Sequence, residues 1–246
     1  MNRDCENQPA ELDKSSARVR QMFGEIAGRY DLLNHVLSLG IDRAWRRKTV
    51  RLVPPQPDGG PILDVCTGTG DLALAYWKAS GRKAQIVGTD FCPPMLALAD
   101  QKSRRAGAQG QISWLEADTQ QLPFPDNKFQ IVCVAFGLRN VSDTDRGLRE
   151  MTRVCRPGGH VAVLEFSTPR LGPLGPLYGW YFQHLLPRIG QALARNRQSA
   201  YNYLPASVSQ FPQGDELAAR MQTAGLAGVE QHRFTLGIAT LYVGHK

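Results

Sequence analysis

The sequence predicts an α/β fold in which a mainly parallel sheet carries helices on both faces. Short apolar runs typical of buried strands alternate with stretches of good helix formers, and this alternation is characteristic of parallel sheets covered on both sides. One strand runs directly into a glycine turn, and the two strands that follow it each end in an acidic residue. Ligands of doubly wound sheets bind at the carboxyl ends of the strands, so the sequence also predicts where a ligand binds.

The first expected strand covers residues 61–65 and leads into the turn Cys-Thr-Gly-Thr-Gly at residues 66–70. Gly68 and Gly70 permit a tight turn, and they leave no Cβ between the backbone and a ligand. With Ala73 as its last position, the same spacing satisfies the relaxed dinucleotide-binding fingerprint. A tight turn without any ligand is a third interpretation, so the turn alone does not decide the function.

The remaining elements continue the alternation of strands and helices. The expected strands cover residues 84–90, 111–118, 128–136 and 159–166, and the expected helices cover residues 93–106 and 144–155. Asp90 ends the second strand, where a carboxylate beside the glycine turn can accept hydrogen bonds from both hydroxyls of a ribose. Asp118 ends the third strand in the same way. We therefore expect the glycine turn and these two acids at one edge of the sheet.

The acidic residues favour a cationic ligand over a dinucleotide. A pyrophosphate fits the glycine turn, but further carboxylates beside it repel a doubly charged anion. A sulfonium cofactor with a free amino group fits better, with Asp64 at the amino acid moiety, Asp90 at the ribose and Asp118 at the adenine amino group. Each acid alone also fits a solvated carboxylate at a strand end. Their joint placement favours S-adenosylmethionine.

Several separated motifs carry a resemblance that runs from about Val19 to Lys246. The most specific are Phe-Gly-Glu-Ile-Ala-Gly-Arg-Tyr-Asp-Leu-Leu-Asn at 23–34 and Phe-Gly-Leu-Arg-Asn at 136–140; the others lie at 38–46, 122–129, 153–159, 164–169, 186–190 and 201–204. With these motifs, the chain resembles the class I S-adenosylmethionine-dependent methyltransferases. More closely, it resembles the family that C-methylates quinone precursors in menaquinone and ubiquinone biosynthesis. The resemblance implies a Rossmann-like, seven-stranded sheet with an N-terminal helical lid.

Carried over position by position, the resemblance implies cofactor contacts at Thr69, Asp90, Asp118 and Thr119, in addition to the turn glycines Gly68 and Gly70 and to Asp64. The chain departs from the family pattern at two positions. Thr67 stands where the family usually has a small residue, and Ala135 stands where serine is common. The missing hydroxyl at Ala135 removes one hydrogen bond, worth about 1 kcal/mol.

The length of 246 residues suits one α/β domain with a lid. The expected layout is a disordered polar tail at 1–16 and a single methyltransferase domain at 17–246, divided into a helical lid at 17–55, a cofactor-binding core at 60–166, a substrate or lid insertion at 170–212, and a C-terminal helix and hairpin at 213–246. We expect a cytoplasmic protein, because no run of eighteen apolar residues and no signal-peptide core is present. Five cysteines without a CxxC pair indicate neither a metal site nor disulfides.

The net charge of +7 leaves several interpretations open. Basic residues cluster at Arg43, Arg46, Arg47, Lys48 and Arg51 beside Trp45, and again at Arg188, Arg195 and Arg197. Solvated helix faces, a nucleic acid and an anionic membrane surface all fit such clusters. The chain has no evident basic platform rich in aromatic residues and no RNA-binding motif, so we expect no nucleic-acid partner. A lipid-tailed substrate would favour a peripheral contact with the inner face of the cell membrane, and a homodimer also stays open.

The apolar, proline- and glycine-rich segment at 171–187 suits a lid or a wall of the substrate channel, with core packing as the alternative.

The reaction that the resemblance implies is methyl transfer to a ring carbon of a prenylated naphthoquinol, which converts demethylmenaquinol to menaquinol. The corresponding methyltransferase of the ubiquinone pathway is the alternative, followed by an NAD(P)-dependent oxidoreductase and a nonenzymatic binding protein. The ring carbon becomes nucleophilic when the neighbouring phenolic oxygen loses its proton, so the site needs a base or a cation. Arg139 is the first candidate for that cation, and Asn140 would orient Arg139 or the substrate. Tyr30 and Asp31 are next in line.

Overall fold

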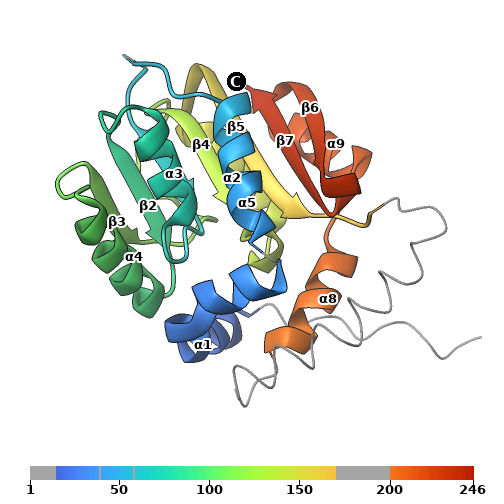
Figure 1. Ribbon diagram of the computed structural model, residues 1–246. Coiled ribbons are helices and arrows are strands. Elements are labelled where there is room, and N and C mark those ends of the chain that lie inside the picture. The colour runs from blue at the N-terminus through green and yellow to red at the C-terminus, as the bar shows by residue number, and fades with distance from the viewer. Residues whose placement is uncertain (1–14, 39, 58, 170–199) are drawn as a thin grey trace, which may run out of the picture.

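The structure is a computed structural model that describes residues 15–38, 40–57, 59–169 and 200–246. Within these residues a seven-stranded sheet has the order β3-β2-β1-β4-β5-β7-β6 (Figure 1). The strands are β1 (Ile62–Val65), β2 (Ile86–Asp90), β3 (Ile112–Glu116), β4 (Phe129–Ala135), β5 (Cys155–Phe166), β6 (Ala227–Phe234) and β7 (Ala239–His245). The first five strands pair in parallel, and β7 runs antiparallel to both of its neighbours. The predicted fold class is confirmed.

Helices cover both faces of the sheet (Figure 1). One face carries α2 (Ile41–Leu52), α3 (Asp71–Ala79) and α4 (Pro93–Ala106), and the other carries α5 (Thr144–Val154) and α9 (Asp215–Thr223). Successive residues of a strand point to opposite faces. Ile62 of β1 therefore joins the core beneath α3, whereas Leu63 joins the core beneath α5. Two apolar cores result, one on each side of the sheet.

The strands agree with the predicted ranges to within a few residues, except at the start of β5. This strand was expected from residue 159, and the structure begins it at Cys155, which pairs with Phe129 of β4. The next pair is Ile131 with His160, so the register shifts between them. The extra residues on β5 contain Pro157 and Gly158, which suggest a turn rather than a strand. The irregular pairing explains why sequence patterns place the start of the strand too late.

The N-terminal segment forms two helices with different surroundings. α1 (Ser16–Leu37) lies beneath the carboxyl ends of the parallel strands, as does α8 (Ala200–Gln210) (Figure 1). α2 instead packs Trp45 and Val50 into the same core as α3. The expected lid at 17–55 thus contains one helix over the strand ends and one that belongs to the sheet packing.

The tail at residues 1–14 and the first part of the expected insertion, residues 170–199, lie outside the described residues. The basic cluster at Arg188, Arg195 and Arg197 and the apolar segment at 171–187 fall in that part. The division of the chain into lid, core and insertion stays a prediction.

Candidate active site

The glycine turn between β1 and α3 uses its two glycines for different purposes. Both have positive φ angles, 57° at Gly68 and 80° at Gly70. A Cβ on Gly70 would lie 2.5 Å from the Trp114 ring, so glycine is required there by packing. A Cβ on Gly68 would meet no atom closer than 3.9 Å, on the Tyr30 ring. The space beside the Gly68 backbone is therefore open to a ligand.

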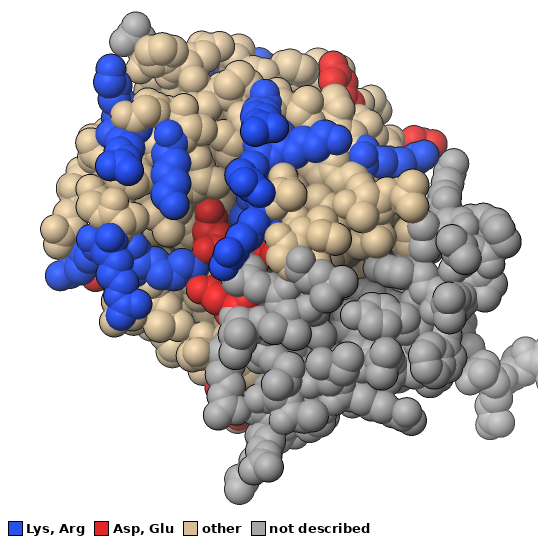
Figure 2. Space-filling view, viewed as in Figure 1, with Lys and Arg blue, Asp and Glu red and all other residues tan. Residues whose placement is uncertain are grey.

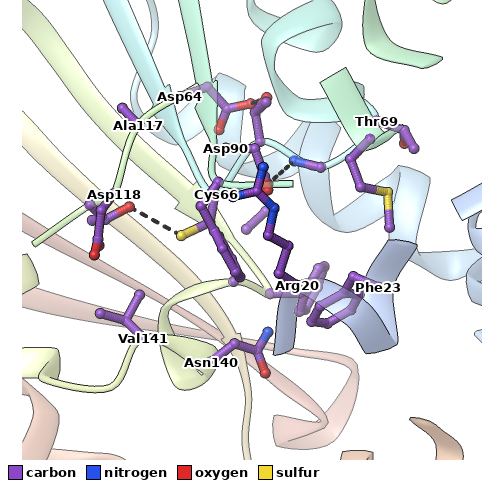
Figure 3. A pocket seen from close by; sticks show the side chains of 18 of the residues that line it. Arg20, Phe23, Asp64, Cys66, Thr69, Asp90, Ala117, Asp118, Asn140 and Val141 are labelled. Atoms are coloured by element: carbon purple, nitrogen blue, oxygen red, sulfur yellow. Dashed lines mark hydrogen bonds between the residues drawn. The ribbon is translucent and has the colours of Figure 1, made fainter. Parts of the chain in front are cut away.

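A cavity of about 510 Å³ lies at the carboxyl ends of the parallel strands, a size typical of small-ligand sites. Its wall includes every cofactor residue predicted from the sequence except Gly70: Asp64, Gly68, Thr69, Asp90, Asp118 and Thr119. Figure 3 shows Arg20 and Phe23 of α1 reaching toward the strand ends from the opposite side. The structure thus brings three strand ends, the loop after β4 and the first helix to one cavity.

Asp90 is fixed at the end of β2 by the backbone around it. Its carboxylate accepts one hydrogen bond from the Gly68 N–H at 2.8 Å and another from the Cys92 N–H at 2.9 Å. Burial raises the pKa of this carboxyl from 3.8 to about 6, although these backbone bonds oppose the shift. A carboxylate has about four acceptor positions, so the two remaining ones can accept the hydroxyls of a ribose.

Asp64 lies deeper, in the middle of β1, with 1% of its surface exposed. Burial raises the pKa of its carboxyl from 3.8 to about 7. The Thr67 hydroxyl donates to Asp64 Oδ2 at 2.5 Å, and the Ala73 N–H donates to the same oxygen at 3.1 Å. Thr67 is one of the two departures from the family pattern, and here its hydroxyl supports the buried acid. The second departure, Ala135, lines the cavity.

Asp118 and Thr119 follow β3 and line the cavity, with Asp118 across the cavity from Thr69 (Figure 3). The Asp118 carboxylate accepts the Gln120 N–H at 2.9 Å. The Thr119 hydroxyl lies 3.2 Å from the Cys66 sulfur. Cys66 has a φ of 47°, uncommon for a residue with a side chain, and burial raises the pKa of its thiol. The thiol is therefore neutral, and it connects the glycine turn to the end of β3.

A polar cluster that the sequence did not predict connects α1 to the glycine turn. Thr69 donates its hydroxyl to Asp31 of α1 at 2.5 Å. The Lys102 ammonium of α4 lies 2.8 Å from Asp31 and 3.1 Å from the Thr69 hydroxyl, and it also pairs with Asp71. Three helices and the turn thus meet at one ammonium group. No local sequence pattern marks Lys102, because all its partners are distant in the chain.

The predicted catalytic pair, Arg139 and Asn140, lies in the short helix η1 (Leu138–Asn140) after β4. The Arg139 guanidinium is buried and pairs with Glu165 at 2.8 Å. It also donates to the Phe136 carbonyl and lies 5.3 Å from the centre of the Phe166 ring. Asn140, in contrast, lines the cavity (Figure 3), and its side-chain oxygen is buried without a hydrogen-bond partner among the described residues. In this structure the Asn140 side chain faces the cavity, while the Arg139 side chain is buried outside it and bound to Glu165 and the Phe136 carbonyl.

Three further cavity residues were not assigned to the site from the sequence. Arg20 and Phe23 come from α1, and Arg46 comes from α2. Arg46 lies within a basic run that fits a solvated helix face, a nucleic acid or an anionic membrane, yet only 9% of its surface is exposed. The signal available in the sequence was the spacing of Asp42 and Arg46, four residues apart, which matches the ion pair observed between them.

The residues of the cavity fit S-adenosylmethionine. Three carboxylates, those of Asp64, Asp90 and Asp118, line the cavity, and the backbone at Gly68 is open to close approach, which suits a ligand that carries an ammonium group, a ribose and an adenine. Comparison with known families gives the decisive observation. Residues 11–246 match the ubiE/COQ5 methyltransferase family.

The chain belongs to the ubiE/COQ5 methyltransferase family. It is 45% identical to the ubiquinone/menaquinone biosynthesis C-methyltransferase UbiE of Geotalea daltonii, over 96% of this chain and 99% of that protein. It is 46% identical to the demethylmenaquinone methyltransferase of Deinococcus radiodurans, over 98% of this chain and 99% of that protein. The protein is therefore a methyltransferase that uses S-adenosylmethionine, and both predictions are confirmed.

Solved structures support the fold at low sequence identity. An S-adenosylmethionine-dependent methyltransferase from Thermotoga maritima superposes with a TM-score of 0.63 at 18% identity, covering 92% of this chain and 99% of that one. A phosphoethanolamine N-methyltransferase of Haemonchus contortus, solved with S-adenosyl-L-methionine, gives a TM-score of 0.58 at 15% identity, covering 82% of this chain and 52% of that one. These likenesses establish the methyltransferase fold of this family member.

Proposed function

We propose that this methyltransferase converts demethylmenaquinol to menaquinol by methylating a carbon of the quinol ring. The observation that carries the proposal is the 46% identity to a demethylmenaquinone methyltransferase along nearly the full length of both chains. A second relative with that function, from Thermus thermophilus, is also 46% identical over 92% of this chain. The corresponding ubiquinone-pathway reaction is the alternative, because the Geotalea relative is named for both quinones.

The cofactor, when bound, supplies an electrophilic methyl group, and the protein must make the ring carbon nucleophilic. We assign the hydrogen bond to the quinol oxygen to Asn140, whose side chain lines the cavity. Such a bond stabilises the negative charge that develops on the oxygen in the transition state. Arg139 and its partner Glu165 hold the turn that carries Asn140. A direct contact of Arg139 with the quinol oxygen, as expected from the sequence, stays a prediction.

The proposed cofactor contacts are those that surround the cavity. Asp64 receives the ammonium group, Asp90 the ribose hydroxyls and Asp118 the adenine amino group, while Gly68, Thr69 and Thr119 shape the wall and Gly70 supports the turn from behind. Phe23 and Phe136 border the same space and offer aromatic surface to a quinol ring. This division places the polar cofactor contacts mainly at β1, β2 and β3, and the acceptor at η1 and α1.

A peripheral contact with an anionic membrane would bring the enzyme to a prenylated quinol. Within the described residues, no helix is long and apolar enough to cross a membrane. A groove between α2, α3 and α4 gathers basic side chains: Arg43, Arg46, Arg47, Arg51, Lys78, Lys102 and Arg105. Figure 2 shows Lys and Arg side chains around this hollow, with acidic side chains at its base. We propose a cytoplasmic enzyme that contacts anionic lipid with this basic groove. A homodimer stays a prediction from the sequence, which sedimentation of the purified protein tests.

The quinones of a strain that lacks this gene test the proposed substrate. Mass spectrometry should show demethylmenaquinone accumulating and menaquinone lost, and restoration when the gene is returned. Restoration by Asn140→Ala at equal protein level should be incomplete, because this variant lacks the proposed hydrogen bond to the quinol oxygen. Accumulation of a demethylated ubiquinone precursor alone would assign the enzyme to the other pathway. Unchanged quinones would contradict a role in either pathway.

A further inference from the structure

We propose that Arg46 binds the carboxylate of the methionine moiety of S-adenosylmethionine. The inference rests on the proposed position of that moiety beside Asp64 and not on the identity of the quinol. The amino acid end of this cofactor carries an ammonium and a carboxylate. The three proposed cofactor acids offer partners for positive and hydrogen-bond-donating groups, so the carboxylate needs a separate cation.

Among the described residues that line the cavity, two are cations, Arg20 and Arg46. Arg20 belongs to the adenine side, because its guanidinium pairs with Glu116 at the end of β3 at 2.8 Å. About half of the Arg20 side chain is exposed (49%). Arg46 belongs to the other side, where its guanidinium lies over the ring of Phe136 in the cavity wall, and where its positive charge offsets a small part of the rise that burial causes in the pKa of Asp64. Arg46 and Asp64 therefore offer opposite charges at the same end of the cavity, as a zwitterionic amino acid requires.

The Arg46 side chain is held ready for a ligand. Its Nη1 donates to Asp42 Oδ2 at 2.5 Å, and Asp42 also accepts the Ser38 hydroxyl at 2.8 Å. The guanidinium carbon lies 5.5 Å from the centre of the Phe136 ring. Asp42 therefore fixes one edge of the guanidinium while an aromatic ring supports its plane.

The other N–H donors of the Arg46 guanidinium have no hydrogen-bond acceptor among the described residues. Arginine carries five N–H donors, yet Nη1 is the only Arg46 nitrogen with a hydrogen bond to the part of the chain that the structure describes. Buried charged groups are normally paired and hydrogen-bonded. A carboxylate can accept two parallel bonds from a guanidinium. The carboxylate of a ligand would thus accept the hydrogen bonds of the Arg46 guanidinium that Asp42 does not accept.

Two cofactor forms that differ only in this group test the inference. Decarboxylated S-adenosylmethionine keeps the sulfonium, ribose, adenine and amino group, and it lacks the carboxylate. Isothermal titration without any quinol should show the wild-type protein binding S-adenosylmethionine roughly tenfold or more tightly than the decarboxylated form, since a charge-assisted pair is involved. Arg46→Met should remove most of this preference by weakening S-adenosylmethionine alone. Arg47→Met, an exposed neighbour on the same helix, is the matched control and should preserve the preference.

The buried Asp42 would lose its partner in Arg46→Met, so the double variant Asp42→Asn/Arg46→Met is measured beside it. Retained binding of the decarboxylated form shows in both variants that the cavity is folded. Equal weakening of the two cofactor forms would overturn the inference. Unchanged binding of both, with slower methyl transfer, would also overturn it, because Arg46 would then act on the quinol oxygen. Because no quinol is present, the result is independent of whether demethylmenaquinol is the substrate.

Discussion

At the scale of the residue, burial gives the two central acids their properties. The pKa of Asp90 is raised to about 6 and that of Asp64 to about 7, in both cases mainly because burial disfavours the charged form. A ligand that needs ionised carboxylates must therefore compete with protons at Asp64 below about pH 7 and at Asp90 below about pH 6. The sequence predicts both acids as cofactor contacts, Asp64 from its place before the glycine turn and Asp90 from its place at the end of a strand. The depth of their burial depends on neighbouring strands, which a single sequence does not show.

Replacing Asp90 should weaken cofactor binding and change its pH dependence. Asp90→Ala removes the charged partner of the ribose, and we expect a loss of about 2 kcal/mol, or roughly thirtyfold in Kd. In the wild-type protein, titration should show affinity falling as pH drops through about 7 and again through about 6. Asp90→Asn should lose the lower step and keep the upper one. A profile that is identical in the two proteins would remove Asp90 from the ribose site.

The same acids should make the stabilising effect of the cofactor depend on pH. Their folded-state pKa values lie above the ordinary value of 3.8, so the stability of the cofactor-free protein that depends on their protonation is lost as pH rises from about 4 to about 7. Binding favours the ionised forms. The rise in melting temperature caused by a fixed concentration of S-adenosylhomocysteine should thus be larger at pH 8 than at pH 5.5. A larger rise at pH 5.5 would contradict the assignment.

Variants of Arg139 test whether this residue positions the turn that carries Asn140 or contacts the quinol oxygen directly. Arg139→Ala leaves Glu165 buried and unpaired, and we expect it to cost about 3–5 kcal/mol of stability. The double variant Arg139→Met/Glu165→Gln should recover most of this stability, measured by denaturant unfolding, and keep turnover within about tenfold of the wild type. Asn140→Ala should instead lower turnover about a hundredfold with little change in cofactor affinity. A hundredfold loss in the folded double variant would favour Arg139 as the cation at the quinol oxygen.

At the scale of the element, the sequence predicts the sheet better than the contacts around it. Alternating apolar runs locate β1 to β4, and helix formers after Cys92 locate α4 correctly from Pro93 to Ala106. The two N-terminal helices differ in a way that their sequences do not reveal. Trp45 packs α2 into the core of the sheet, whereas Asp31 of α1 contacts Thr69 of the glycine turn and Lys102 of α4. Such contacts between distant segments depend on the packing of whole helices.

The contact of α1 with the glycine turn should slow the release of the cofactor. Lys102 holds Asp31, Thr69 and Asp71 together, so Lys102→Met should loosen α1 and raise the dissociation rate of S-adenosylhomocysteine several-fold. This corresponds to roughly 1 kcal/mol, the size of a partly buried polar interaction. Stopped-flow displacement measures the rate. Lys78 lines the basic groove together with Lys102 but forms no ion pair among the described residues. The control variant Lys78→Met should therefore leave the dissociation rate unchanged. Equal rates in wild type and Lys102→Met would show that this cluster does not retain the cofactor.

At the scale of the whole molecule, charge and cavity lie in neighbouring parts of the structure. Arg46 and Asp71 border both the cofactor cavity and the basic groove. The net charge and the basic run of α2 can be read from the sequence. That basic side chains of α2, α3 and α4 surround one groove (Figure 2) can be seen only in the folded structure. A surface that binds anionic lipid would hold the cavity near a prenylated substrate.

Vesicle binding tests the membrane contact. Arg47→Ser/Arg51→Ser should weaken binding to phosphatidylserine vesicles by roughly 2 kcal/mol, at about 1 kcal/mol for each basic residue. Wild-type binding should fall steeply when the ionic strength rises from about 0.1 M to 1 M, because the Debye length shrinks from about 10 Å to 3 Å. Arg146→Ser/Arg149→Ser on α5, at the other face of the sheet, is the charge-matched control. Equal binding to neutral and anionic vesicles, or tight binding to RNA with none to vesicles, would exclude the proposal.

The central claim is methyl transfer to a ring carbon of demethylmenaquinol, and a single-turnover reaction tests it most directly. The purified protein is mixed with S-adenosylmethionine carrying a deuterated methyl group and with equal amounts of a short-chain demethylmenaquinol and the corresponding ubiquinone-pathway benzoquinol. Fragment mass spectrometry then locates the label. We predict a deuterated methyl group on a ring carbon of the naphthoquinol, with at least tenfold less on the benzoquinol and about a hundredfold slower transfer by Asn140→Ala. Label on the benzoquinol alone, on an oxygen of either compound, or on neither would contradict the account.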